Sequence, residues 1–145
     1  MSETGRDEDR QLTDRGQRQV QYLADNIAAR TDSPAALLAS PIRRAIDTAR
    51  LLHASLGGAL RTESALITGQ PASLAVNLIE SQPPVDSLML VGHNPQLEEV
   101  IEWLTRGRCS GCDELRTGEA VILETPGEHI LGRCRVIERL RLGED

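Results

Sequence analysis

Two short segments of the sequence place reactive side chains between an apolar run and a helix. One is Ala39-Ser40-Pro41, followed in the next turn by Arg44, and the other is Gly92-His93-Asn94-Pro95. A guanidinium grips phosphate oxygens with forked N–H groups, and an imidazole can donate to such oxygens or take part in their transfer. Arg44 and His93 therefore predict a site for a phosphoryl group, with Ser40 and Asn94 as further phosphate-binding side chains.

The elements around these segments are predicted to bring them together. Leu88–Val91 is an uninterrupted apolar run, which suits a strand buried on both faces, and Asn94 with Pro95 is typical of a helix start with a capping side chain. The Ser40-Pro41 pair repeats this arrangement after an apolar strand at 35–39. Parallel strands end at one sheet edge, where helix N-termini attract anions and α/β proteins bind ligands. The two segments are therefore expected to meet at that edge.

A purely structural interpretation stays open for the same residues. Arg43 and Arg44 could be solvated arginines of a first helical turn, although cations are poorly placed there electrostatically. His93 could instead cap a helix or pack in a turn.

Hydrophobic periodicity predicts a chain of alternating helices and strands. Helices are expected at 14–30 after the cap Thr13, at 41–56, at 72–80 and at 96–106; strands are expected at 35–39, 60–65, 88–91, 119–125 and 130–140, with a hairpin turn at 126–128. The helical side chains expected to be buried are Val20, Leu23, Ala24, Ile27, Ala28, Ile42, Ala45, Ile46, Ala49, Leu52, Leu74, Leu78, Ile79, Leu97, Val100, Ile101 and Leu104.

This element order predicts an α/β fold. We expect a single three-layer domain over residues 1–145, with a polar loop at 1–11 and a folded part at 12–142. Its sheet is expected to be mostly parallel and flanked by helices, with an antiparallel C-terminal hairpin. The first predicted element is a helix, so no strand precedes it.

Composition narrows the range of partners. The chain has 145 residues and a net charge of -6, and its aromatic residues are Tyr22 and Trp103 alone. Few aromatic side chains and an acidic balance argue against nucleic-acid binding. No apolar stretch is long enough to cross a membrane and the N-terminus shows no signal segment, so a cytoplasmic location without membrane contact is predicted. The oligomeric state is left open.

The segment Cys109-Ser110-Gly111-Cys112 has the spacing of a metal or redox pair. A zinc site would need two further ligands, and Cys134 and His129 are the available side chains. A redox pair and incidental loop thiols are the alternatives. Incidental thiols are favoured, so neither a metal site nor a cofactor is predicted.

Three motifs together resemble one family. Leu12-Thr13-Asp14-Arg15-Gly16-Gln17-Arg18-Gln19, then Ser40-Pro41-Ile42-Arg43-Arg44-Ala45-Ile46-Asp47-Thr48-Ala49, then Val91-Gly92-His93-Asn94-Pro95 occur in the order seen in histidine phosphatases, the phosphoglycerate-mutase-like superfamily. The small size and the Gly-His-Asn-Pro sequence resemble the SixA-type phosphohistidine phosphatases most. The resemblance covers about Arg10 to Thr125.

The resemblance implies a reaction and roles for two residues. Members of the family transfer a phosphoryl group to a histidine and then to water, without a metal. Arg44 resembles the pocket arginine of the Ser-Pro-x-x-Arg-Ala segment, and His93 resembles the second pocket histidine, which supports the transferring group. The implied substrate is a phosphohistidine in a protein or a small phosphate ester. Glu63 lies near the expected place of a general acid, but a solvated charge at a strand end is the favoured interpretation.

The sequence departs from the family at the nucleophile. The family's nucleophilic histidine follows an arginine in an Arg-His-Gly motif at the end of the first, central strand, and this sequence has no Arg-His pair. His53 falls in the third turn of a predicted helix and His129 in a hairpin turn, so neither replaces it. The central strand and the nucleophile are therefore expected to be missing. Such a loss leaves backbone groups unpaired and costs orders of magnitude in rate.

Three hypotheses follow from this departure. The first is a phosphohistidine phosphatase truncated at its N-terminus, with Met1 an internal methionine; an in-frame Arg-His-Gly strand in the upstream coding DNA would support it and a stop codon would contradict it. The second is a catalytically dead module that binds phosphorylated partners through Arg44. The third is a small zinc or redox protein that uses Cys109 and Cys112.

Overall fold

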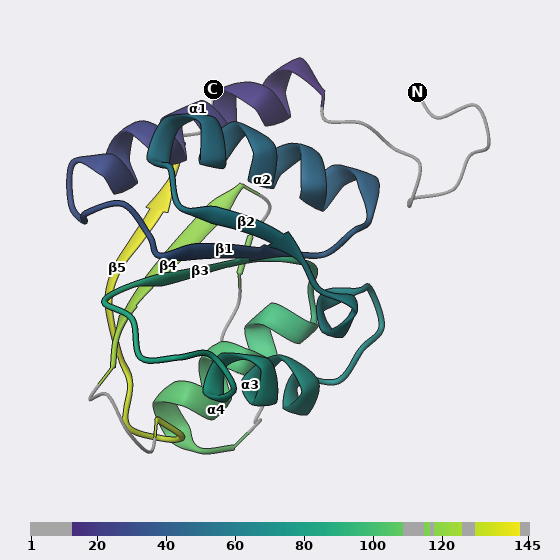
Figure 1. Ribbon diagram of the computed structural model, residues 1–145, viewed down its shortest axis with the longest axis vertical. Coiled ribbons are helices and arrows are strands. Elements are labelled where there is room, and N and C mark those ends of the chain that lie inside the picture. Colours follow the sequence, from purple (N-terminus) through teal and green to yellow (C-terminus); the bar gives the residue numbers. More distant parts are fainter. Residues whose placement is uncertain (1–12, 109–114, 117, 126–129, 143–145) are drawn as a thin grey trace.

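The computed structural model describes residues 13–108, 115–116, 118–125 and 130–142. Its elements are, in chain order, α1 (Asp14–Ala28), β1 (Ala36–Ala39), α2 (Arg43–Leu56), β2 (Ala59–Thr62), the 3₁₀ turn η2 (Ser64–Leu66), α3 (Ala72–Glu80), β3 (Leu88–Val91), α4 (Gln96–Arg106), β4 (Glu119–Glu124) and β5 (Arg135–Arg141). Helices α1 and α2 cover one face of the strands, and α3 and α4 cover the other (Figure 1). The predicted α/β class is confirmed.

The strands form two sheets. One is parallel with the order β2-β1-β3, and the other is the antiparallel pair β4-β5. In Figure 1 the β4-β5 pair runs at a steep angle to β1–β3. The predicted parallel sheet and antiparallel C-terminal pair are thus both present, but no described strand joins them.

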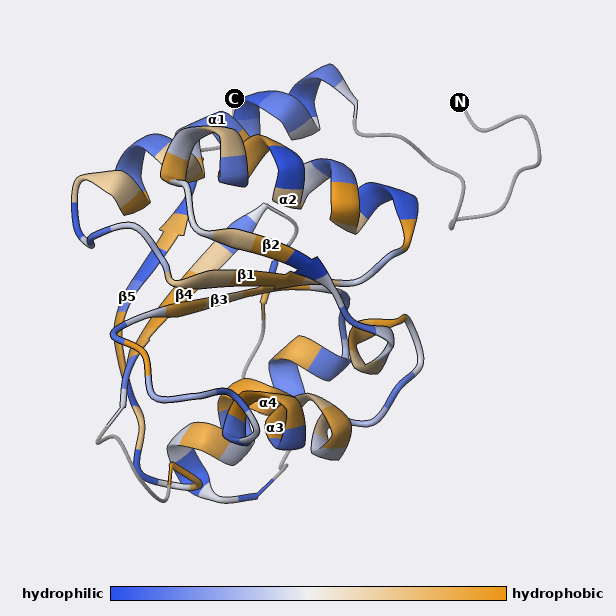
Figure 2. Cartoon of the chain, viewed as in Figure 1, coloured by the Kyte–Doolittle hydropathy of each residue, from blue (hydrophilic) through white to orange (hydrophobic). Residues whose placement is uncertain are grey.

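The central strand β1 divides the core into two layers. Leu37 and Leu38 are both fully buried, and because successive side chains of a strand point to opposite faces, they enter different clusters. Leu38 packs with α3 and α4, whereas Leu37 packs with α1 and α2. Apolar residues accordingly dominate the strands between the helices (Figure 2).

Of the four helix starts, one differs from prediction. Thr13 caps α1 as expected, since its Oγ1 accepts the Gly16 N–H at 3.0 Å. Helix α2 begins later than predicted, at Arg43, whereas α4 begins at Gln96 as predicted; neither has a side-chain cap. The expected caps Ser40 and Asn94 use their side chains elsewhere, as described for the site below.

Several burial predictions were wrong because small residues form the contacts. Leu74 is 38% exposed, since α3 packs through Ala72, Ala75 and Val76. Ala28 lies on the exposed side at the end of α1, and Ile42 and Leu97 are only partly buried. The remaining helical side chains that were expected to be buried are buried or pack against the two main clusters or the smaller one around Ala39.

Strand predictions were less accurate at the edges of the fold. The last strand begins at Arg135 and not at Ile130, because the chain first turns so that the Cys134 N–H donates to Leu104 O at 2.8 Å. All four residues of β3 are partly exposed, so the prediction of a strand buried on both faces was wrong. The cause is that β3 lies at the edge of its sheet. The predicted turn at 126–128 lies outside the described residues.

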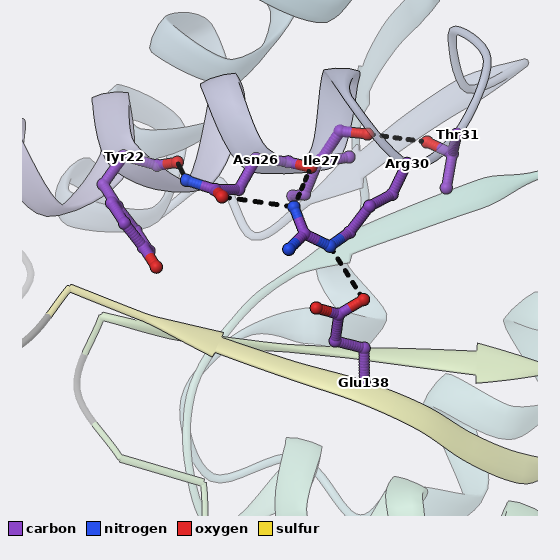
Figure 3. A network of polar contacts seen from close by, with 6 residues as sticks. All are labelled: Tyr22, Asn26, Ile27, Arg30, Thr31 and Glu138. Atoms are coloured by element: carbon purple, nitrogen blue, oxygen red, sulfur yellow. Dashed lines mark hydrogen bonds and ion pairs between the residues drawn. The ribbon is translucent and has the colours of Figure 1, made fainter.

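The β4-β5 pair is tied to the rest of the molecule by α1 and α4. The Arg30 Nε lies 2.7 Å from Glu138 Oε1, and Arg30 also donates to the Asn26 carbonyl at the end of α1 (Figure 3).

Within the part of the chain that the structure describes, no helix is long and apolar enough to span a membrane.

Candidate phosphate site

The two segments predicted to meet do so at the carboxyl edge of the parallel sheet. Strands β1 and β3 pair in register, with Ala39 opposite Val91, and the Ser40 N–H donates to Val91 O at 2.9 Å. One residue beyond β1 and two residues beyond β3 the side chains also join, with Ser40 Oγ 2.9 Å from His93 Nε2. The sequence pattern predicts that both residues lie at this edge, but it does not predict the direct hydrogen bond between them.

The Ser40 hydroxyl is held from two sides. It is fully buried, and its oxygen accepts the Ile42 N–H at 3.1 Å in addition to its bond with His93. A hydroxyl has one donor and two acceptor positions, so both contacts are compatible with a neutral imidazole in either tautomer. Ser40 thus fixes the orientation of the His93 ring. This contact occupies one ring nitrogen and leaves the other for a ligand.

The structure distinguishes the two arginines at the start of α2. Arg43 is paired, since its Nε lies 3.1 Å from Asp47 Oδ2 one turn further along the helix. The side chain of Arg44 is exposed and has no hydrogen bond or ion pair with any described residue. Arg44 is therefore the guanidinium that remains available for an anion.

Two causes lower the pKa of His93. Burial is the larger, because it penalises the charged ring, and the positive Arg44 guanidinium is the second. Since the ordinary pKa of histidine is about 6.5, the ring is uncharged at neutral pH.

We expect Arg44→Ala to raise the pKa of His93 without restoring it to its ordinary value. The charge of Arg44 is removed, but burial, the larger cause, remains. An NMR titration of the His93 ring in both proteins measures this. In the wild type the folded state binds fewer protons than the unfolded state, so His93 is expected to reduce stability as the pH falls through the range below about 6.5. An unchanged His93 titration in the variant would contradict the proximity of the two groups.

Asn94 lies next to the site but binds another segment. Its Nδ2 donates to Leu115 O at 2.6 Å, and Glu98 Oε2 accepts the Leu115 N–H at 2.8 Å. These two contacts hold the backbone of Leu115 against the start of α4. The phosphate-binding role of Asn94 stays a prediction, and in this structure its amide nitrogen has another partner.

Two further residues at this edge position the backbone. Glu63 follows β2 as Ser40 follows β1, and its N–H donates to Ala39 O at 2.8 Å, while its carboxylate lies 3.9 Å from Arg61 Nε. Buried Gln96 donates from Nε2 to Ala65 O and Pro71 O at 2.7 and 3.0 Å, which ties the start of α4 to the β2–α3 connection. Sequence analysis missed Gln96, and its only signal was a polar residue in a predicted helix start.

We expect Ser40→Ala to destabilise the protein by about 1–3 kcal/mol, because the Ile42 N–H and His93 lose a buried partner. Ser81→Ala is the control, since Ser81 is exposed: its Oγ donates to Leu78 O and accepts from Gln82 Nε2 at 3.4 Å, and its removal should cost less than about 1 kcal/mol. Urea unfolding measures both. An equal decrease in the free energy of unfolding in both variants would show that the hydrogen bonds of the Ser40 hydroxyl do not stabilise the fold.

The other histidines and the cysteines lie elsewhere or outside the described residues. His53 Nε2 lies 3.0 Å from Gly58 O at the end of α2. Cys134 is buried, its Sγ donates to Ile130 O at 3.5 Å, and burial raises its pKa. Cys109, Cys112 and His129 lie outside the described residues. Among the residues that are described, no three His, Cys, Asp or Glu side chains are grouped closely enough to hold a metal ion.

Comparisons with known proteins bear on the family and on the fold. The model of the histidine phosphatase superfamily, branch 1, matches residues 2–68. The sequence matches no curated protein. A solved SixA protein of Agrobacterium tumefaciens, titled a phosphohistidine phosphatase, superposes with a TM-score of 0.80 at 25% identity, covering 99% of this chain and 90% of that one.

Other solved structures share the fold at lower identity. A protein histidine phosphatase SixA complexed with tungstate has a TM-score of 0.81 at 16% identity, covering 94% of this chain and 87% of that chain. A mycobacterial glucosyl-3-phosphoglycerate phosphatase with inorganic phosphate has a TM-score of 0.57 at 16% identity, with 87% and 85% covered. The first part of the sequence thus matches the model of the histidine phosphatase superfamily, and the chain has a SixA-like fold.

Proposed function

We propose that this chain binds phosphoryl groups at the edge formed by Ser40, Arg44 and His93. The observation that carries the proposal is the Ser40–His93 bond of 2.9 Å, which joins two strand ends beside an arginine without a partner among the described residues. A forked guanidinium, a neutral imidazole nitrogen and the N-terminus of α2 all favour an anion with several oxygens. We propose that Arg44 neutralises the negative charge of the phosphoryl group and that His93 orients the phosphoryl group.

The proposed ligand is a phosphohistidine of a protein. The SixA structures to which the chain is similar are titled phosphohistidine or protein histidine phosphatases, which supports this choice. The alternative is a small phosphate ester, which is supported by the similarity to the glucosyl-3-phosphoglycerate phosphatase. Both ligands present the same phosphoryl oxygens, so the described residues fit either.

We propose further that the chain of this sequence binds such groups without transferring them to a histidine. Its histidines are His53, His93 and His129, and none follows an arginine. His93 has one ring nitrogen committed to Ser40 and an electrostatic neighbour in Arg44, an arrangement suited to support a phosphoryl group. Among the described residues no second histidine lies at the site, so the covalent step has no acceptor there.

The decisive experiment compares three peptides of one sequence, carrying phosphohistidine, phosphoserine or no phosphate. Calorimetry should show binding of the phosphohistidine peptide and little binding of the unphosphorylated one, and phosphate release should stay at the rate without protein. Equal binding of all three peptides would refute the phosphoryl site. Catalysed release that is lost in His93→Gln would refute the binding-only proposal and show an active enzyme. Binding of phosphoserine as tight as that of phosphohistidine would favour the ester alternative.

A further inference from the structure

One peptide group of the segment before β4 is held against the corner of the chain that contains His93. Its carbonyl oxygen, which belongs to Leu115, accepts from Asn94 Nδ2 at 2.6 Å, and Asn94 directly follows His93 in the chain. Its N–H belongs to Arg116, and Glu119 Oε1 accepts this N–H at 2.9 Å. Both polar atoms of the peptide group have a partner, so the backbone of Arg116 has a fixed place beside the proposed phosphate site.

Two further hydrogen bonds fix the neighbouring backbone groups. The Leu115 N–H donates to Glu98 Oε2 at 2.8 Å, which ties the segment to the first turn of α4. The Glu119 N–H donates to Arg116 O at 3.0 Å, which closes the turn that leads into β4. The side chain of Arg116 therefore leaves the backbone at a well-defined point.

The guanidinium of Arg116 takes no part in these contacts. The Arg116 side chain is exposed and has no hydrogen bond or ion pair with any described residue. Glu98 and Glu119, the two carboxylates that hold the segment, accept backbone N–H groups, and neither forms an ion pair with Arg116. The chain has a net charge of -6 and still leaves this cation unpaired within its described part. The guanidinium is therefore available to an anionic group of a ligand.

Arg116 and Arg44 belong to different elements on the two sides of His93. Arg44 lies in the first turn of α2, which follows β1, whereas Arg116 precedes β4 and is joined to the site through Asn94. Arg116 is thus one residue further from the proposed phosphoryl group than His93 is. It is placed for a group of the ligand that lies next to the phosphoryl group. In a protein ligand, that group is the side chain of a residue that flanks the phosphohistidine.

We propose that Arg116 binds an acidic side chain beside the phosphohistidine and thereby selects phosphoproteins with aspartate or glutamate at that place. This inference rests on the proposed function, because it needs the phosphoryl group at Arg44 and His93. A guanidinium offers two parallel N–H groups to the two oxygens of a carboxylate. Because Arg116 is exposed, the ion pair stays in contact with water and changes the affinity a few-fold and not by orders of magnitude.

The test uses three peptides of one sequence. The first has two aspartates on each side of a phosphohistidine, the second has asparagines in their place, and the third has the aspartates around an unmodified histidine. Calorimetry measures the affinity of each peptide for the whole chain and for Arg116→Gln, at about 0.1 M salt. We expect the wild type to prefer the first peptide over the second, and Arg116→Gln to reduce this preference by about threefold to fivefold.

Arg133→Gln is the matched control. Arg133 is also exposed, and its side chain has no hydrogen bond or ion pair with a described residue. It lies beyond the other end of α4, where the Gly132 N–H donates to Trp103 O at 2.9 Å. The helix is roughly 15 Å long, which exceeds the Debye length of about 10 Å at this salt concentration. The loss of the Arg133 charge should therefore change the preference by less than about 1.5-fold.

The possible failures differ in what they overturn. An unchanged preference in Arg116→Gln, with both phosphopeptides still bound, would overturn the role of Arg116 and leave the phosphoryl site intact. An equal loss of affinity for both phosphopeptides would also overturn that role, because Arg116 would then bind the phosphoryl group itself. Equal changes in Arg116→Gln and Arg133→Gln would reduce the effect to net charge. Equal binding of the first and third peptides would refute the proposed function, and the inference with it.

Discussion

Arg44→Ala is expected to weaken the binding of inorganic phosphate or of a phosphohistidine peptide by about tenfold to a hundredfold. Hydrogen bonds to charged groups contribute about 1.5–3 kcal/mol each, which corresponds to that range of affinity. Arg44 is exposed and has no ion pair with a described residue, so within the described part of the chain no contact of its side chain must be broken before it binds an anion. Calorimetric titration of both proteins at low ionic strength measures the difference.

Arg43→Ala is the matched control for this prediction. The two arginines are neighbours in the first turn of α2 and contribute the same charge to the protein. Arg43 is already paired with Asp47 at 3.1 Å, so its loss should reduce affinity by less than about threefold through the general field. A similar loss of affinity in both variants would mean that phosphate binding depends only on the net charge of the protein. The specific site at His93 would then be disproved.

The meeting of Ser40 with His93 could be predicted from sequence only in outline. Two apolar runs that end in similar segments suffice to place both residues at one edge of a parallel sheet, and the structure has them there. Their direct bond could not be predicted, because it depends on where the chain turns after each strand. Ser40 Oγ accepts the Ile42 N–H, and α2 begins at Arg43, a start that the sequence pattern did not predict.

Burial was predictable where a residue has neighbours on all sides. Leu38 and Leu88 lie in similar apolar runs, and both were expected to be buried in a strand between helices. In the structure Leu38 is fully buried and Leu88 is partly exposed, because β1 has a neighbouring strand on each side and β3 has a neighbouring strand on one side only. Sequence periodicity reports the two faces of a strand and contains no information about its two edges. The partial exposure of β3 could therefore not be predicted from the hydrophobic pattern.

Leu38→Ala is expected to lower the free energy of unfolding by about 2–5 kcal/mol, the range for leucine removed from a tightly packed core. Leu38 is fully buried among α3, α4 and η2 at the centre of the sheet, so the surrounding atoms have little freedom to fill the space. The same change at Leu51, which is 37% exposed on α2, should cost less than about 1 kcal/mol. Urea unfolding followed by circular dichroism measures both variants.

Leu88→Ala adds an intermediate case that tests the arrangement of the sheet. Leu88 packs against the same cluster as Leu38 but stays partly exposed at the β3 edge, so less apolar area is lost and the cavity is open to water. The expected order of destabilisation is therefore Leu38→Ala, then Leu88→Ala, then Leu51→Ala. A loss at Leu88 as large as that at Leu38 would require β3 to be enclosed on both edges in solution.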